Sequence, residues 1–313
     1  MIPRKLSRLS LPLIAFLSAC LFNSALAQQN SESLVFHALV TDDKGRMYSG
    51  LKLENFSAWI DKEPVKILSV EAERSPATIG FIFDASGSVA PSRQRDLNAF
   101  WRQISAGVKR FMDASNVENE YFAVVFDGKV SMSKSWTGTD SPQLGNLSVD
   151  DDKPYGTALY DAIYYGLQNA NNGRHSRRVV LILSDGQDNN SKRTFTDVRD
   201  LIKKSDVTVS AIGLVPGLGG ASSLGMEGQG VLDELTGLSG GRAVFIDQHA
   251  KLEVLNQAFA LFAAEIQNQY RVSVEKKTLA GKEKWRKLQL KLDLPKEKGR
   301  PKLHIRTRDG YYQ

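Results

Sequence analysis

Three short polar segments carry the side chains that could bind a metal ion. They are DASGS at residues 84–88, GT at 156–157 and SDG at 184–186. The candidate ligands in these segments are Asp84, Ser86, Ser88, Thr157 and Asp185. Carboxylate and hydroxyl oxygens, with no Cys or His among them, suit Mg²⁺, or Mn²⁺ or Ca²⁺, and disfavour zinc. The segments therefore predict a site for a hard divalent ion.

The elements around these segments would bring them together. The first segment ends the apolar run TIGFIFD and the third ends VVLILS, both typical of buried strands. Ligands of open α/β sheets lie at the carboxyl ends of such strands. Gly87, Gly156 and Gly186 would permit the tight turns that let neighbouring side chains converge. The alternative for Asp84 or Asp185 alone is capping of the following helix.

Residues 78–247 alternate between strand and helix patterns, and a last helix follows. Apolar residues recur at helical spacing in 92–114, 156–170, 195–205, 231–241 and 252–269. Further strands are expected at 121–128, 177–186, 207–214 and 242–247. The glycine-rich stretch 216–230 is expected to be a connection. This alternation predicts an α/β fold with a doubly wound, mainly parallel sheet.

Two β-rich segments flank this region. Strands are expected at 34–41, 56–61, 65–72, 270–275, 288–294 and 302–307. Because each segment is small, we expect the two to pair into one flanking β-sandwich-like unit; the alternative is two small sheets packed separately on the α/β body. The predicted organisation is an N-terminal β segment at 28–75, an α/β domain at 76–269 and a C-terminal β segment at 270–313.

The N-terminus has the pattern of an export signal. Three basic residues precede an apolar stretch and the small-residue site SALA, which predicts a signal peptide at 1–27. The alternative is a lipobox, LSAC at 17–20, in which Cys20 would carry a lipid anchor. Either route predicts a periplasmic or secreted protein. Cys20 is the single cysteine, so no disulfide can form within the chain.

The order of the three motifs resembles the metal-ion-dependent adhesion site of von Willebrand factor type A domains. The matching segments are DASGS at 84–88, GTALYDA at 156–162 and LSDGQDN at 183–189. The resemblance implies hydroxyl ligation by Ser86, Ser88 and Thr157, and carboxylate ligation, direct or through water, by Asp84 and Asp185. Tyr155 departs from the family pattern, which often has a small residue there. The flanks resemble bacterial exported proteins with VWFA-related domains.

The resemblance implies a binding function. A carboxylate from an Asp or Glu of a protein partner would complete the metal shell, as in an adhesion or envelope-assembly module that is not an enzyme. Nucleic acid is not an expected partner, because residues 28–270 carry a net charge of −6 and would repel phosphate.

Two other functions compete with binding. One is a structural envelope protein with a vestigial site, and the other is a Mg²⁺-dependent hydrolase. A phosphotransferase of the haloacid-dehalogenase type would need Asp where Ser86 stands, and a serine hydrolase would need GxSxG around Ser86. Residues 216–230 contain neither GxxxxGK[ST] nor GxGxxG, which disfavours nucleotide binding.

Overall fold

The computed structural model describes residues 33–90, 94–138, 156–215, 223–276, 284–295 and 299–313. The predicted signal peptide, Cys20 and Tyr155 lie outside the described residues. Residues 33–313 form a single contact unit, and the domain boundaries expected near residues 75 and 269 stay predictions. No helix in the described part of the chain is both long and apolar enough to span a bilayer.

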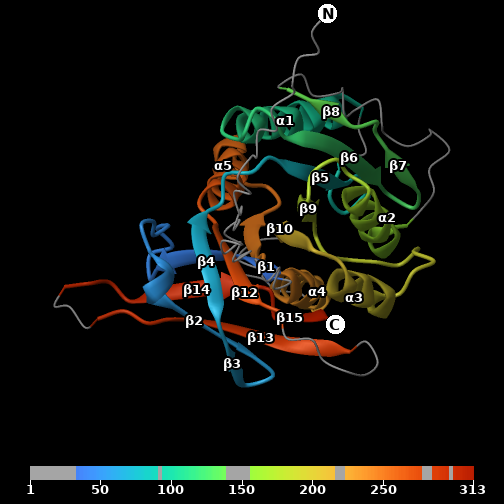
Figure 1. The fold of residues 1–313 in the computed structure, drawn as a ribbon. Helices are drawn as coiled ribbons and strands as arrows, with labels where there is room; N and C mark the ends of the chain where they lie inside the picture. Colours follow the sequence, from blue (N-terminus) through green and yellow to red (C-terminus); the bar gives the residue numbers. More distant parts are fainter. Residues whose placement is uncertain (1–32, 91–93, 139–155, 216–222, 277–283, 296–298) are drawn as a thin grey trace, which may run out of the picture. The chain divides into compact units, whose positions relative to one another are not determined.

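A mostly parallel sheet forms the centre of the fold (Figure 1). Its strand order is β11-β10-β9-β5-β6-β7, and β8 also pairs with β6. The parallel strands are β5 (Ala77–Asp84), β6 (Glu120–Phe126), β9 (Arg177–Ser184), β10 (Val207–Val215) and β11 (Ala243–Asp247). The short β7 (Val130–Met132) and β8 (Trp136–Thr137), which the sequence did not predict, are antiparallel to β6. The predicted doubly wound, mainly parallel fold is confirmed.

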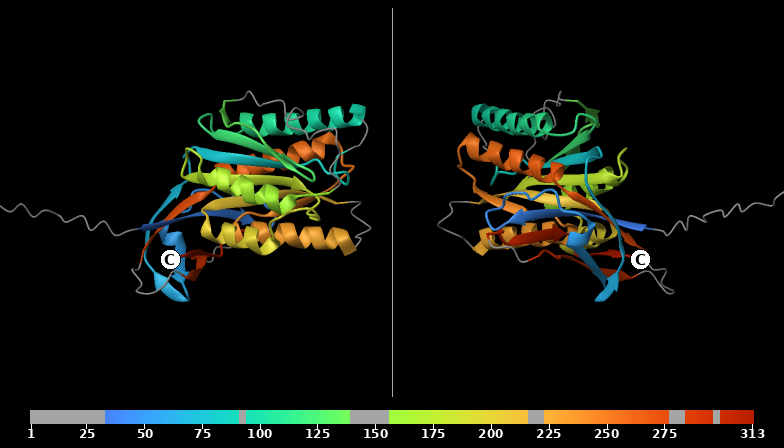
Figure 2. Two further views of the ribbon diagram at one scale, coloured as in Figure 1. Left: turned by 90° about the vertical axis from the view of Figure 1, so that its right-hand side faces the viewer. Right: turned by 60° about the vertical axis from the view of Figure 1, so that its left-hand side comes forward.

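Helices cover both faces of this sheet (Figure 2). One face packs against α1 (Gln94–Asp113) and α5 (Leu252–Gln267); the other packs against α2 (Leu159–Asn171), α3 (Phe195–Lys204) and α4 (Ser223–Ser239). Within β5, Phe81 and Phe83 face the first layer and Ile82 faces the second. Each such fully buried side chain contributes roughly 1.5–3 kcal/mol. Every residue of β5 is buried, which explains its unbroken apolar run.

Helix α4 corrects one expectation. It begins at Ser223, so the part of the glycine-rich stretch from residue 223 to 230 is helix and the predicted connection is wrong there. Glycine inside a helix costs about 1 kcal/mol relative to alanine, which hides the helix in the sequence. Close packing requires glycine at position 228, because a Cβ there would press on the carbonyl oxygen of Asp185.

The flanking strands form two antiparallel sheets, each built from both ends of the chain. One has the order β14-β1-β12-β4 and contains β1 (Ser33–Asp42), β4 (Ile67–Ala72), β12 (Tyr270–Glu275) and β14 (Leu303–Thr307). The other has the order β15-β13-β2-β3 and contains β2 (Phe56–Ile60), β3 (Glu63–Val65), β13 (Trp285–Leu292) and β15 (Gly310–Tyr312). A one-turn 3-10 helix, η1 (Leu53–Asn55), precedes β2.

These two sheets share one apolar core. The ring of Phe36 in β1 lies 5.6 Å from that of Tyr311 in β15, and the ring of Phe56 in β2 lies 5.4 Å from that of Tyr270 in β12. The alternating leucines of β13 contribute Leu288 and Leu290, both buried. The predicted β-sandwich-like unit of N- and C-terminal strands is confirmed, and we call it the β unit.

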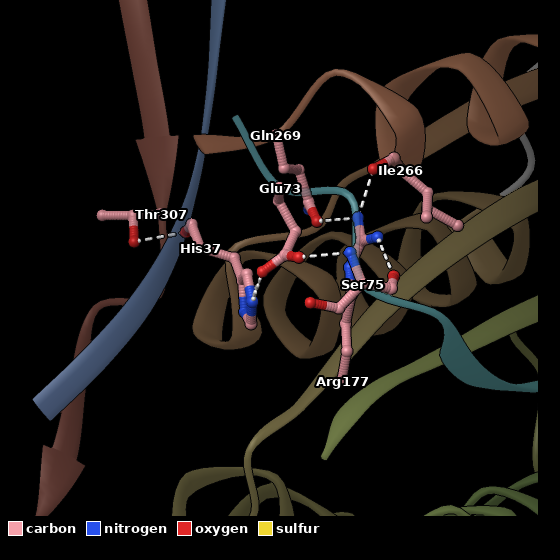
Figure 3. A network of polar contacts seen from close by, with 7 residues as sticks. All are labelled: His37, Glu73, Ser75, Arg177, Ile266, Gln269 and Thr307. Atoms are coloured by element: carbon pink, nitrogen blue, oxygen red, sulfur yellow. Dashed lines mark hydrogen bonds and ion pairs between the residues drawn. The ribbon is translucent and has the colours of Figure 1, made fainter. Parts of the chain in front are cut away.

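The chain passes between the β unit and the α/β region at two adjacent places, residues 73–76 and residues 268–269. The Glu73 amide donates to the Gln269 carbonyl at 2.8 Å. Arg177, the first residue of β9, joins both crossings (Figure 3). Its guanidinium donates to the Ser75 carbonyl at 3.2 Å, to Gln269 Oε1 at 2.8 Å and to the Ile266 carbonyl. One buried cation therefore fastens the two links.

Glu73 is the anionic part of this junction. Its side chain is 3% exposed, and its carboxylate accepts hydrogen bonds from His37 Nε2 at 3.0 Å and from the Ser75 amide at 2.8 Å. Burial alone would raise the pKa of Glu73, but these hydrogen bonds and the charge of Arg177 outweigh it and lower the pKa to about 2. The charged form of Glu73 therefore stabilises the folded state.

We predict that Glu73→Gln lowers the free energy of unfolding by up to about 3 kcal/mol at pH 7. Because the folded-state pKa of about 2 lies below the ordinary value of 4.5, this contribution is present above pH 4.5 and is lost as the pH falls toward 2. Urea unfolding of both proteins across this range measures the difference. Glu71→Gln, at an exposed position of β4, is the control and should show no such trend. The prediction would be contradicted if the difference in free energy of unfolding between Glu73→Gln and the wild type stays constant down to pH 2.

Candidate metal centre

The carboxyl ends of β5 and β9 lie side by side and hold the first and third polar segments. The strands pair in parallel register, with Phe83 opposite Leu183. Asp84 is the last residue of β5, and Ser184, the last residue of β9, donates its hydroxyl hydrogen to Asp84 Oδ2 at 2.6 Å. Two neighbouring strands therefore deliver their polar ends to one point, as an open α/β sheet requires.

Asp84 is completely buried. Burial raises the pKa of its carboxyl group to about 7; the charge of Asp185 adds to this rise, while hydrogen bonds from Ser184 and Ser86 oppose it. Two carboxyl groups are therefore close enough to repel each other in a buried place. A divalent cation between them would remove the cause of that repulsion.

The DASGS segment turns back over Asp84. The Ser86 amide donates to Asp84 Oδ1 at 2.9 Å, and the Ser86 and Ser88 hydroxyl oxygens lie 3.2 Å apart. The amides of Val89 and Ala90 both donate to the Ser86 carbonyl. The turn thus brings two hydroxyl groups to the same side of the buried carboxylate.

Thr157 lies in the loop before α2 and is buried. Its amide donates to Asn189 Oδ1 at 2.8 Å, and its carbonyl accepts from the amides of Asn189 and Asn190, each at 3.0 Å. These bonds tie the second polar segment to the loop that follows Asp185. Asp185 itself is half-buried, and its Oδ1 accepts from the Gln187 amide at 3.0 Å.

The donor set suits a hard cation. The candidate ligands in the three polar segments are two carboxylates and three hydroxyl groups. Among the described residues, no three His, Cys, Asp or Glu side chains gather in a way that could hold a metal ion. A cation between Asp84 and Asp185 would need further oxygen ligands, and the hydroxyl groups of the three segments are candidates that fit Mg²⁺ better than zinc. The ligand roles of Asp84, Ser86, Ser88, Thr157 and Asp185 stay predictions.

The structure adds residues that sequence reasoning missed. Ser184 immobilises Asp84, and its hydroxyl oxygen also accepts from the Gly186 amide at 3.0 Å. Asp188 accepts from the Tyr160 amide at 3.1 Å and from the Ser191 hydroxyl, and so fixes the start of α2. Ser184 ends the apolar strand pattern directly before Asp185. This position in the sequence could have indicated that its side chain lies beside Asp84.

The three glycines differ in their roles. Gly156 and Gly186 have φ of +139° and +82°, so the turns at these residues need glycine as expected. Gly87 has no positive φ, and a Cβ there would meet no atom within 4 Å. The expectation that Gly87 is needed for the first turn is therefore wrong, because the Asp84–Ser86 hydrogen bond shapes that turn without left-handed backbone.

Comparison with known proteins identifies the family. The model of the von Willebrand factor type A domain matches residues 78–258, which is more than half of the chain. The matched region contains all three polar segments and the central sheet. The chain therefore belongs to the von Willebrand factor type A domain family. No curated protein sequence matches the chain.

Solved structures are similar to parts of this chain at low sequence identity. Conserved hypothetical protein BatB from Bacteroides thetaiotaomicron is 16% identical, over 61% of this chain and 100% of that one, with a TM-score of 0.42. A von Willebrand factor type A protein from Catenulispora acidiphila is 13% identical, over 84% and 70%, with a TM-score of 0.44. Proximal thread matrix protein 1 from the mussel byssus is 19% identical, over 66% and 49%, with a TM-score of 0.47. The match thus spans about half of the mussel protein.

We predict that Gly186→Ala lowers the free energy of unfolding by about 1–3 kcal/mol, because alanine is strained at φ +82° and its Cβ would press on the Gly228 backbone in α4. Gly87→Ala is the matched control and should change stability by less than about 0.5 kcal/mol. Urea unfolding with a chelator present separates this effect from metal binding. Equal free energies of unfolding for the two variants would contradict the prediction and show that the loop after β9 accommodates a Cβ at residue 186.

Proposed function

We propose that this chain is an exported, metal-dependent protein-binding module. Mg²⁺, or Mn²⁺ or Ca²⁺, would be held by Asp84, Ser86, Ser88, Thr157 and Asp185, directly or through water. The observation that carries the proposal is a completely buried Asp84 beside Asp185, with the hydroxyl groups of the first loop turned over it. A buried carboxyl group with a raised pKa is neutralised either by a proton or by a cation, and no basic side chain of the described residues contacts Asp84.

Hydrogen bonds around the proposed ligands would hold them in place to bind a metal ion. Ser184 and the Ser86 amide orient the two oxygens of Asp84, and the Asn189 contacts fix Thr157. The ion, balanced in charge by two carboxylates and otherwise held by three neutral hydroxyl groups, would keep one of the six positions of Mg²⁺ open. A carboxylate from an Asp or Glu of a protein partner would fill that position, as at adhesion or envelope-assembly contacts.

The competing functions predict different observations. A Mg²⁺-dependent hydrolase would use a general base or nucleophile at the same edge of the sheet, and Ser184, Ser86 and Asp185 lie around Asp84, so turnover and not residue type separates the two functions. A structural envelope protein with a vestigial site would bind no ion. Turnover of phosphoester and ester substrates with Mg²⁺ present would favour the hydrolase over the binding module.

Export is part of the proposal and rests on the sequence of residues 1–27. Cleavage after Ala27 would release a protein that begins at Gln28, whereas processing at the lipobox would leave Cys20 as the first residue with a lipid anchor. Mass spectrometry of the mature protein distinguishes the two products. A full-length chain that keeps Met1 in the cytoplasm would contradict export.

We predict that Mg²⁺ at about 100 times its dissociation constant stabilises the folded protein by about 2.7 kcal/mol, which corresponds to a rise in Tm of roughly 5 °C. Asp185→Ala should abolish this rise and still melt cooperatively, because the side chain is half-buried and is not part of the apolar core. Asp113→Ala, an exposed position at the end of α1, is the control and should keep the full rise. Differential scanning fluorimetry with Mg²⁺ or chelator measures it. A wild-type melting curve that is insensitive to both would contradict a metal site.

Partner binding has its own test. Wild-type protein and Asp185→Ala are used as baits for envelope extract, each with Mg²⁺ and with chelator. The proposal expects a partner that is retained only by the wild type and only with Mg²⁺. A partner retained equally in all four conditions would show that binding does not use the metal centre.

A further inference from the structure

A second polar site lies at the opposite end of the central sheet. A cavity of about 550 Å³ opens between the β unit and the amino ends of β9 and β10, beside the junction of Glu73 and Arg177 (Figure 3). We call it the junction cavity. Its charged lining residues include His37, Glu71, Arg74, Arg177, Arg271 and Arg308. Its volume lies within the range of small-molecule sites.

Several of the charges at the junction cavity already have partners. The carboxylate of Glu73 accepts from His37 and from the Ser75 amide. Arg308 donates to Asp206 Oδ1 at 2.6 Å and to the carbonyls of Lys203 and Ser205. These contacts stabilise the walls of the junction cavity. The remaining charged side chains of the lining are available to bind a ligand.

Two cations of the lining have no such partner. The guanidinium groups of Arg74 and Arg271 form no hydrogen bond or ion pair with any described residue. Arg271 is half-buried in β12, between His37 of β1 and Glu71 of β4 in the cross-strand register. Glu71 lies opposite Arg271 in this register but forms no ion pair with it, so the partly buried guanidinium would gain from the closer counter-charge of a ligand.

Arg177 adds a third positive charge behind these two. It is 6% exposed, and its three acceptors are two carbonyl oxygens and the Gln269 side-chain oxygen, all of them neutral. Its Nε is buried and has no hydrogen-bond partner. Two arginines at the cavity wall, Arg74 and Arg271, therefore form no ion pair with any described residue. The buried Arg177 has neutral hydrogen-bond acceptors, and the carboxylate of Glu73 balances its charge.

We propose that the junction cavity binds a small anion bearing carboxylate or phosphate groups, held by Arg271 and Arg74. The planar guanidinium group donates two parallel hydrogen bonds to either group, so both share one recognition chemistry. The largely charged and polar lining disfavours an apolar ligand. The bound anion would join β12 to the link between β4 and β5, and so would contact both sides of the junction.

This site is separate from the candidate metal centre. Arg177 begins β9 and Ser184 ends it, so seven residue steps, or about 23 Å of strand, separate the two sites. Anion binding at the cavity can therefore be measured with a chelator present, when the metal centre cannot contribute.

The test uses the mature chain with inorganic phosphate or succinate, each compared with sodium chloride at equal ionic strength and with a chelator present. Isothermal titration calorimetry and thermal melting give affinity and stabilisation. We expect at least one anion to bind saturably and raise Tm. Saturation by phosphate alone would identify a phosphate ligand, and saturation by succinate alone a carboxylate ligand.

Substitutions locate the binding. Arg271→Gln and Arg74→Gln should each weaken the affinity for the anion at least tenfold. Arg271→Lys keeps the charge but not the planar guanidinium group, so its affinity should lie between those of the wild type and Arg271→Gln. Arg102→Gln, at an exposed position of α1, is the matched control and should bind like the wild type. Because Arg74 is exposed, Arg74→Gln should fold even if Arg271→Gln does not.

Two outcomes would overturn the proposal. One is that neither anion binds more strongly than chloride up to about 10 mM, far above the dissociation constants typical of specific sites. The other is saturable binding whose affinity is unchanged in both Arg74→Gln and Arg271→Gln, which would place the anion elsewhere.

Discussion

Burial of the central sheet between two helix layers is the constraint on which the rest of the structure depends. β5 is buried along its whole length, so it can carry polar side chains only where it ends. Its carboxyl end carries Asp84, which lies against Ser184 at the end of β9. The amino end of β9 carries Arg177, which holds the junction to the β unit. The two candidate sites therefore lie at opposite ends of the same central strand.

The parts of the fold that follow from this constraint were predictable from the sequence. A strand covered on both faces must be apolar between its ends, as residues 179–183 are in β9. A strand covered on one face must alternate, as Leu288 and Leu290 do in β13. The polar segments were visible because they interrupt those runs where the strands end. The pairing of N- and C-terminal strands followed from the small size of each segment.

The parts that depend on contacts distant in sequence were not predictable. Glu73 and Arg177 lie about a hundred residues apart, and nothing in either local pattern indicates that they meet. The first turns of α4 contain glycines that argue against a helix, yet Gly228 is tolerated because it lets the helix approach the carbonyl of Asp185. Gly87 shows the reverse case, in which a glycine beside the site has ordinary backbone geometry.

The β unit and the α/β region are joined by polar contacts, while their apolar cores are separate clusters. Besides the Glu73 junction, the buried Glu265 of α5 accepts a hydrogen bond from Arg306 of β14 and forms an ion pair with Arg242. Such contacts depend strongly on geometry and on neighbouring charge, whereas apolar burial depends mainly on area. The charged contacts of Glu73, Arg177 and Glu265 across this boundary are therefore expected to be more sensitive to substitution than either apolar core.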